Sequence, residues 1–124
     1  MLKAVECLVS AAALAFLTTA PALAQAPVPP PPNWSPNLDC NARIYAVDTL
    51  ICEDVALLES ARKVEAAYVR AAAVRPDGSL QADQVAWSKQ RNMCVFERKA
   101  SGCVKRLQDR RTKTLEALIL GFQP

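Results

Sequence analysis

The chain of 124 residues contains no histidine. Histidine is the usual general base near neutral pH, the usual activator of a nucleophilic serine or cysteine, and the commonest metal ligand. Its absence excludes those catalytic pairs and c-type haem attachment. No two carboxylates stand out by their spacing as an acid and a base. We therefore expect a protein without enzymatic activity, cofactor or bound metal.

Short cysteine spacings are also missing. Eleven residues lie between Cys40 and Cys52 and eight between Cys94 and Cys103, so there is no C-x-x-C motif of the zinc-knuckle or thioredoxin type. From Asn41 onward, no segment shows the alternation of apolar and polar residues that indicates a half-buried strand.

The first 24 residues have the composition of an export signal. Lys3 precedes an apolar run over residues 7–17, and an Ala-Leu-Ala sequence ending at Ala24 offers the small residues that signal peptidase recognises. We expect cleavage after Ala24 and a periplasmic or secreted product with no stable membrane span. The alternative is a retained anchor, because Glu6 weakens the positive start of the signal.

Cleavage leaves a short chain with four cysteines: Cys40, Cys52, Cys94 and Cys103. An even set of cysteines in a short exported chain is typical of a disulfide framework formed in an oxidising compartment. A domain of this size buries only a modest core, so its stability should depend on these bonds.

The net charge is mildly positive. The chain has 15 Lys and Arg against 12 Asp and Glu, a formal charge of +3, and cleavage removes Lys3 and Glu6 together and leaves this value unchanged. Such a charge allows a preference for anionic partners. It falls short of the density of dedicated nucleic-acid binders, so we expect no nucleic-acid partner.

Residues 26–36 contain six of the nine prolines. Each proline fixes φ and removes a backbone donor, so we expect residues 25–38 to form an extended polyproline-type spacer. The alternative is a ligand for a proline-recognising domain. The folded domain is then expected over residues 39–121.

Helical periodicity marks the first half of this domain. Apolar residues recur at steps of three and four in two stripes, one of Ile44, Val47, Ile51, Val55 and Leu58 and another of Leu57, Ala61, Val64 and Tyr68. Asp54 is a suitable N-cap that would divide these residues into a short first helix over 41–51 and a longer second helix.

Two further helices are expected in the second half. The turn signal at residues 76–79 precedes a third helix from about Leu80 to Phe96, with Asp77 or Ser79 as its cap. A loop at Ser101-Gly102 leads to a fourth helix that ends near Gly121 and carries Val104, Leu107, Arg111, Leu115 and Leu118. The sequence thus predicts an all-α, disulfide-stapled bundle of about four helices.

Four cysteines allow three pairings, and the sequence leaves the choice open. If residues 41–51 formed one regular helix, Cys40 and Cys52 would lie about 18 Å apart, beyond the roughly 7 Å limit for a bridge. This favours bonds between the two halves of the domain. The local pairs, Cys40 with Cys52 and Cys94 with Cys103, need a short first helix and a chain that folds back.

One face of the third helix carries an unusual set of side chains. Steps of three, four and three place Gln84, Trp87, Arg91 and Cys94 together. In the structural interpretation, Trp87 fills the core, its indole N–H and the Gln84 amide find partners, and Arg91 pairs with Asp48. The alternative is that Trp87 and Arg91 form a recognition patch.

These residues resemble the lysozyme-inhibitor LprI-type domain family. The similarity covers residues 39 to about 118 and includes the motif from Gln84 to Cys94 and the remaining positions Cys40, Asp48, Cys52, Tyr68, Cys103 and Arg111. The chain differs from the family at Ser60-Ala61, where Leu-Asp is usual, at Asp48, where glutamate is common, and at Gln108, where tyrosine is usual. The resemblance implies a small four-cysteine helical domain and a non-enzymatic protein that binds a lysozyme.

Two binding functions are compatible with the sequence. An inhibitor would place cationic groups against the two catalytic carboxylates of a lysozyme, and Arg98 and Lys99 are the residues we expect to do so. Alternatively, Arg106 and Arg110 belong to a basic fourth helix, which suits an envelope scaffolding module that binds an anionic cell-wall or membrane polymer. The same basic face also fits a solvated surface without a partner.

Overall fold

The computed structural model describes residues 35–122, so the predicted signal peptide and most of the predicted spacer lie outside the described residues. These residues form α1 (Ala46–Glu53), α2 (Val55–Val74), α3 (Ser79–Asn92), the 3₁₀ helix η1 (Met93–Phe96) and α4 (Ala100–Gly121), and they include no strand. The prediction of an all-α, disulfide-stapled bundle is confirmed.

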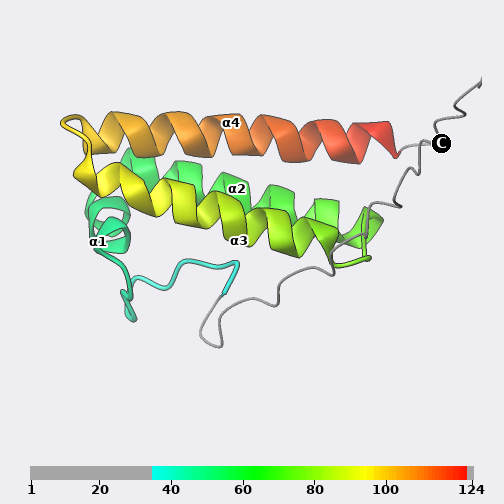
Figure 1. Cartoon of the computed structure of the whole chain (residues 1–124), viewed down its shortest axis with the longest axis horizontal. Helices are drawn as coiled ribbons and strands as arrows, with labels where there is room; N and C mark the ends of the chain where they lie inside the picture. Colours follow the sequence, from blue (N-terminus) through cyan, green and yellow to red (C-terminus); the bar gives the residue numbers. More distant parts are fainter. Residues whose placement is uncertain (1–34, 123–124) are drawn as a thin grey trace, which may run out of the picture.

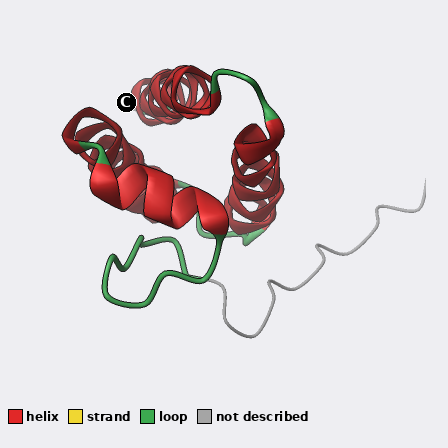
Figure 2. Cartoon of the chain, turned by 90° about the vertical axis from the view of Figure 1, so that its left-hand side faces the viewer, coloured by secondary structure: helices red, strands yellow, loops and turns green. Residues whose placement is uncertain are grey.

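The three long helices run along the length of the molecule in alternating directions (Figure 1). Viewed from the end that carries η1, they lie around a common centre, and the short helix α1 crosses in front of them (Figure 2). The most extensive packing joins α2 to α4. Within residues 35–122, no helix is both long enough and apolar enough to cross a bilayer.

The apolar core has two parts along the bundle. One lies near α1 and consists of Val47, Ile51, Leu57, Ala61, Cys94 and Val104. The other lies further along and consists of Val64, Ala67, Tyr68, Ala71, Leu80 and Leu115. The predicted stripe of α2 is therefore confirmed as core.

Local capping explains where the helices begin. The Asp54 carboxylate accepts hydrogen bonds from the N–H groups of Ala56 and Leu57, which satisfies two donors at the start of α2 and confirms the predicted N-cap. Before α3, Gly78 has a φ of 79°, a left-handed conformation that glycine adopts without a Cβ clash. The Asp77 carboxylate accepts from the backbone N–H of Ser79, but the N-cap of α3 is Gly78, so the prediction of Asp77 or Ser79 as the cap is wrong.

Three further local expectations are wrong. The first helix begins at Ala46 rather than at residue 41, and Ile44, placed on its apolar stripe, is 57% exposed. Val55 is 83% exposed, because the Asp54 cap starts a new helix and the stripe of α1 does not continue through it. Ser101-Gly102 lies in the first turn of α4, and the loop falls earlier, at residues 97–99.

The preference for disulfides between the two halves of the domain is also wrong. The bonds are the local ones, Cys40 to Cys52 and Cys94 to Cys103. Residues 40–45 form turns instead of helix, so the chain folds back and the Cα atoms of Cys40 and Cys52 lie 5.7 Å apart. The condition stated for the local pairing, a short first helix, is met.

The segment before α1 is fixed to the bundle at several points. Leu38 packs against the core near α1, and its backbone N–H donates to the Glu65 carboxylate on α2. Arg62 donates to the Leu38 carbonyl oxygen at 2.9 Å and to the same Glu65 carboxylate at 2.8 Å. With Cys40 bonded to Cys52, this segment forms one wall of the cleft described below.

Removing either disulfide should lower the free energy of unfolding by about 2 to 3 kcal/mol, because loops of 12 and 9 residues gain freedom in the unfolded chain. Urea denaturation of Cys40→Ser/Cys52→Ser and of Cys94→Ser/Cys103→Ser measures this loss. Peptide mapping without reductant provides the control. A peptide that joins Cys40 to Cys94 or Cys103 would contradict the local pairing.

Candidate functional site

A cleft of about 310 Å³ opens between the segment before α1 and a half-buried face of α3. The segment before α1, together with α1, contributes residues 35–39, Ala42, Ile44, Tyr45 and Asp48 to its lining. Helix α3 contributes Gln84, Trp87, Ser88, Arg91 and Asn92. The predicted motif on α3 therefore lines a cleft, and only part of it is core.

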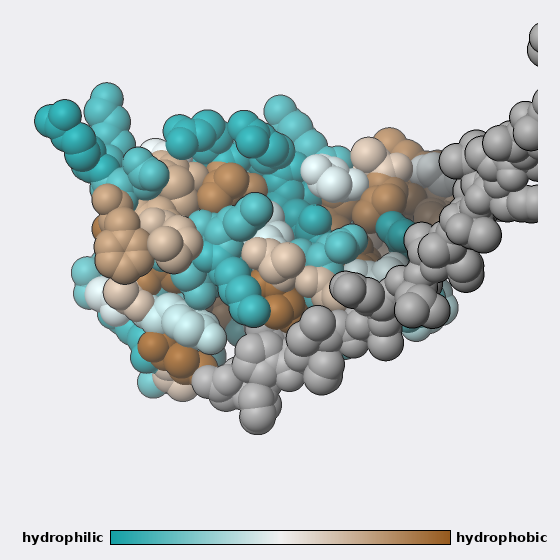
Figure 3. Space-filling model, viewed as in Figure 1, coloured by the Kyte–Doolittle hydropathy of each residue, from teal (hydrophilic) through white to brown (hydrophobic). Residues whose placement is uncertain are grey.

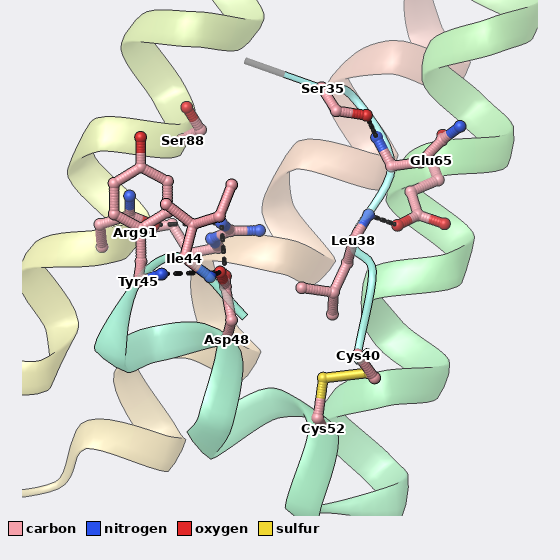
Figure 4. Close-up of polar contacts among 12 residues, drawn as sticks. Ser35, Leu38, Cys40, Ile44, Tyr45, Asp48, Cys52, Glu65, Ser88 and Arg91 are labelled. Carbon is pink, nitrogen blue, oxygen red and sulfur yellow. Dashed lines mark hydrogen bonds and ion pairs between the residues drawn. A yellow bond between two sulfur atoms is a disulfide. The ribbon is translucent and has the colours of Figure 1, made fainter. Parts of the chain in front are cut away.

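Asp48 connects the two walls (Figure 4). Its side chain is buried, and one carboxylate oxygen accepts hydrogen bonds from the N–H groups of Ile44 at 3.1 Å and Tyr45 at 2.9 Å. The other oxygen lies 3.8 Å from a terminal nitrogen of Arg91. The predicted pair of Asp48 and Arg91 is thus present, at a distance of an ion pair rather than of a hydrogen bond.

Arg91 lies at the base of the cleft, with 13% of its side chain exposed. Its guanidinium carbon is 5.5 Å from the centre of the Trp87 ring, which is within the range of a cation–π contact. A terminal nitrogen of Arg91 donates to the Asn92 amide oxygen at 3.0 Å. Burial lowers the pKa of Arg91, and the charge of Asp48 opposes that change. The guanidinium remains charged, because the ordinary pKa of an arginine side chain lies far above neutral pH.

Trp87 differs from the expected core residue. It is half-buried, packing against the core part that contains Leu115 while also lining the cleft. Among residues 35–122 no hydrogen-bond partner faces its buried indole N–H, nor the buried Nε of Arg91. The expected partner for the indole is therefore not found in this part of the chain.

Behind the cleft, the remaining motif residues form a buried polar contact. Gln84 is 3% exposed, and its amide oxygen accepts from the Nε of Arg111 on α4 at 2.8 Å. Tyr68 lies beside this pair, and burial raises the pKa of its hydroxyl above the ordinary 10.0, with the Arg111 charge acting in the opposite sense. These three residues connect α2, α3 and α4 and are structural.

A second site is the closed loop between η1 and α4. The disulfide joins Cys94, which is 1% exposed, to Cys103, while the intervening Arg98 and Lys99 are exposed. Phe96 is 80% exposed and Met93 is 62% exposed. Figure 3 shows hydrophobic side chains (brown) at this left-hand end of the molecule.

A third surface is the basic side of α4. Lys105, Arg106, Asp109, Arg110 and Lys113, with Gly102, line an open groove of about 460 Å³. Lys105 pairs with Asp109 at 2.6 Å, which leaves Arg106, Arg110 and Lys113 without an ion pair in the described part of the chain. Figure 3 shows hydrophilic side chains (teal) along the upper edge, where α4 runs.

The structure separates the predicted site residues into three groups. The cleft unites Asp48, Gln84, Trp87 and Arg91, the loop holds Arg98 and Lys99, and α4 carries Arg106 and Arg110. Sequence reasoning missed Tyr45 and Phe96. Tyr45 fell inside the predicted first helix but off its apolar stripe, so its aromatic type was the available signal, and an aromatic residue two positions after a bridged cysteine was the signal for Phe96.

No group of three or more metal-ligating side chains comes together in residues 35–122. Comparison of the chain with protein-family models, with curated proteins and with solved structures found no match in any of the three.

We expect Asp48→Ala to lower the free energy of unfolding by about 2 to 3 kcal/mol, because the N–H groups of Ile44 and Tyr45 lose their acceptor and the largely buried Arg91 loses its counter-charge. A double-mutant cycle with Arg91→Met should give a coupling of about 1 kcal/mol. Urea denaturation measures both values. The matched control is the exposed pair of Glu59 and Lys63, 3.0 Å apart, whose removal should change stability by less than about 0.5 kcal/mol.

An effect of Asp48→Ala as small as that of the exposed pair would show that Asp48 does not hold the two walls of the cleft together.

The raised pKa of Tyr68 predicts a loss of stability in alkali. The folded state holds the proton more tightly than the unfolded chain, so stability is complete below pH 10 and falls as the pH rises through the folded pKa. Denaturation at pH 8 to 11.5 should show a shallower fall for Tyr68→Phe than for the natural chain. Tyr45→Phe is the control, since Tyr45 is 44% exposed, and an equal effect of both substitutions would contradict the assignment.

Proposed function

We propose that this protein is an exported, non-enzymatic binding protein that inhibits a lysozyme by inserting the closed loop between Cys94 and Cys103 into the substrate cleft of the enzyme. The observation that carries this proposal is the composition of that loop, which presents Phe96, Arg98 and Lys99 to solvent from a disulfide-closed frame. The resemblance of the sequence to LprI-type domains supports it independently.

The loop is held in shape before any partner binds. The Glu97 N–H donates to the Cys94 carbonyl at 3.0 Å, and the Cys103 N–H donates to the Lys99 carbonyl at 3.0 Å. Val95 packs against the core near α1, so the loop is anchored from inside as well. A loop that is already ordered loses little conformational entropy on binding, and more of its contact energy becomes affinity.

The side chains of the loop suit a lysozyme cleft. Lysozymes hydrolyse glycosidic bonds with two carboxyl groups that flank the bond to be cleaved. Arg98 and Lys99 would supply cationic partners for those groups, while Phe96 would cover the apolar wall that contacts sugar rings. Aromatic and arginine side chains are the types that most often carry the energy of protein interfaces.

Export is part of the same proposal. Two disulfides are typical of proteins that fold in an oxidising compartment, and the expected signal peptide over residues 1–24 would deliver the chain to the periplasm or the cell exterior.

A second function is favoured by the groove on α4. Arg106, Arg110 and Lys113 lie along one helix face with no acidic partner among residues 35–122, which suits the phosphate or carboxylate groups of an anionic envelope polymer. Such binding would weaken strongly with added salt, because exposed charges are screened within about 10 Å at 0.1 M. Lysozyme binding through packed loop contacts should depend on salt far less.

The test is titration of the oxidised, exported protein against animal-type, goose-type and invertebrate-type lysozymes at two salt concentrations, with cell-wall lysis and direct binding both measured. We expect one class to be inhibited. Phe96→Ala, and separately Arg98→Ala/Lys99→Ala, should weaken that inhibition by about 30-fold or more, the effect typical of an interface hot spot.

Arg106→Glu/Arg110→Glu is the matched control, because it reverses two exposed charges on a different face. Inhibition that survives this change and is lost with the loop variants supports the inhibitor. If no lysozyme is bound and the charge reversal abolishes retention on an anionic cell-wall polymer, the inhibitor proposal is wrong and the second function stands.

A further inference from the structure

We propose that the cleft between residues 35–45 and α3 is a binding site for a neutral saccharide, with Tyr45 and Trp87 contacting the sugar ring and amide side chains binding its hydroxyl and acetamido groups. This site lies apart from the loop between Cys94 and Cys103. It does not depend on the partner of that loop.

The size of the cleft suits a small ligand. Its volume of about 310 Å³ falls at the lower end of the roughly 300–1,000 Å³ that is typical of small-molecule sites. The largest hydrophobic side chains at its rim, Ile44 and Tyr45, are 57% and 44% exposed and therefore accessible to a ligand.

The charges around the cleft oppose an anionic ligand. Arg91 is the one cation among the lining residues. Its positive charge is compensated by the carboxylate of Asp48 at 3.8 Å and by the negative charge of Glu65 on α2. Asp39 adds a further negative charge at the rim. An added carboxylate or phosphate would therefore meet a net negative lining, while a neutral ligand avoids that cost.

The cleft does not favour a cationic ligand either. The carboxylate of Asp48 is buried and already has three partners, namely the N–H groups of Ile44 and Tyr45 and the guanidinium of Arg91. Recruiting it to a cationic ligand would weaken its hydrogen bonds with these N–H groups and its pairing with the largely buried Arg91. Asp39 is exposed, where a single ion pair contributes little.

The neutral groups of the lining match what a sugar offers. Asn37 and Asn92 carry amides, and Ser35 and Ser88 carry hydroxyls, so the cleft presents both donors and acceptors. Sugar hydroxyl and acetamido groups are likewise both donors and acceptors. Tyr45 and Trp87, which both line the cleft, supply aromatic surface for the C–H faces of the sugar.

The walls are set before a ligand arrives. The wall before α1 is held by the Cys40–Cys52 bond, by the Asp48 carboxylate and by the contacts of Leu38 with Glu65 and Arg62. Figure 4 shows Tyr45 and Ile44 on one side of this region and Leu38 and Ser35 on the other. Binding of a ligand would therefore cost little conformational entropy in the protein.

The experiment follows the fluorescence of Trp87 during titration with chitotriose, a neutral trimer of N-acetylglucosamine, and with cellobiose. The protein is the oxidised full mature chain with Trp34→Phe, which leaves Trp87 as its single tryptophan. We expect a saturable change for at least one of the two saccharides. Raising the salt from 50 to 500 mM should change the dissociation constant by less than about twofold, since neutral ligands are not screened.

Two variants locate the site. Tyr45→Ala should weaken binding by about tenfold or more, because the exposed ring is lost from the rim, and Asn37→Ala should weaken it by about threefold without touching the core. Phe96→Ala, on the closed loop, should leave saccharide binding unchanged. Backbone amide shifts should move at Tyr45, Ser88 and Asn92 in an NMR titration.

Three results would overturn the proposal. The first is no saturable change with either saccharide at 20 mM. The second is a shift map centred on the closed loop or on α4. The third is tighter binding of citrate or of a proline-rich peptide in the cleft, which would assign the site to an anion or to a peptide.

Discussion

The arrangement of this domain depends on the carboxylate of Asp48. This carboxylate accepts hydrogen bonds from the N–H groups of Ile44 and Tyr45 and so caps the start of α1. The residues before α1 therefore turn instead of continuing the helix. Because the chain turns there, Cys40 returns to Cys52, and the segment from Ser35 to Tyr45 stands opposite α3. The same carboxylate faces Arg91 across the cleft, so one side chain connects local capping, disulfide pairing and the candidate site.

Both disulfides are local, and neither joins two of the three long helices. Each closes a short stretch of chain, one before and within α1 and the other between η1 and α4. The contact between α2 and α4 consists of apolar packing around Val64, Leu115 and Val104. The Ser60 hydroxyl adds a hydrogen bond to the Asp109 carboxylate at 2.9 Å. Each disulfide thereby holds a short segment of helix and loop in a defined shape on a small core, as the binding functions proposed for these segments require.

The three candidate surfaces differ in chemistry and do not overlap in their key residues. The closed loop combines exposed aromatic and cationic groups, α4 is basic and open, and the cleft is mixed, with its charges largely compensated. Each therefore suits a different class of partner: a protein, a polyanion and a neutral sugar. Their separation means that a substitution in one surface tests that surface alone.

The sequence by itself determined the all-α class, the cap at Asp54, the turn at Asp77-Gly78 and the stripe of α2, because these depend on residues within one or two turns of each other. It also indicated the pair of Asp48 and Arg91, since a charge on an inward helix face needs a partner. The disulfide pairing, the position of Trp87 at a cleft and the exposure of Phe96 were decided by the tertiary structure. They depend on where the segment before α1 packs against α3 and on which side chains of η1 face solvent. Helical periodicity does not encode either of these features.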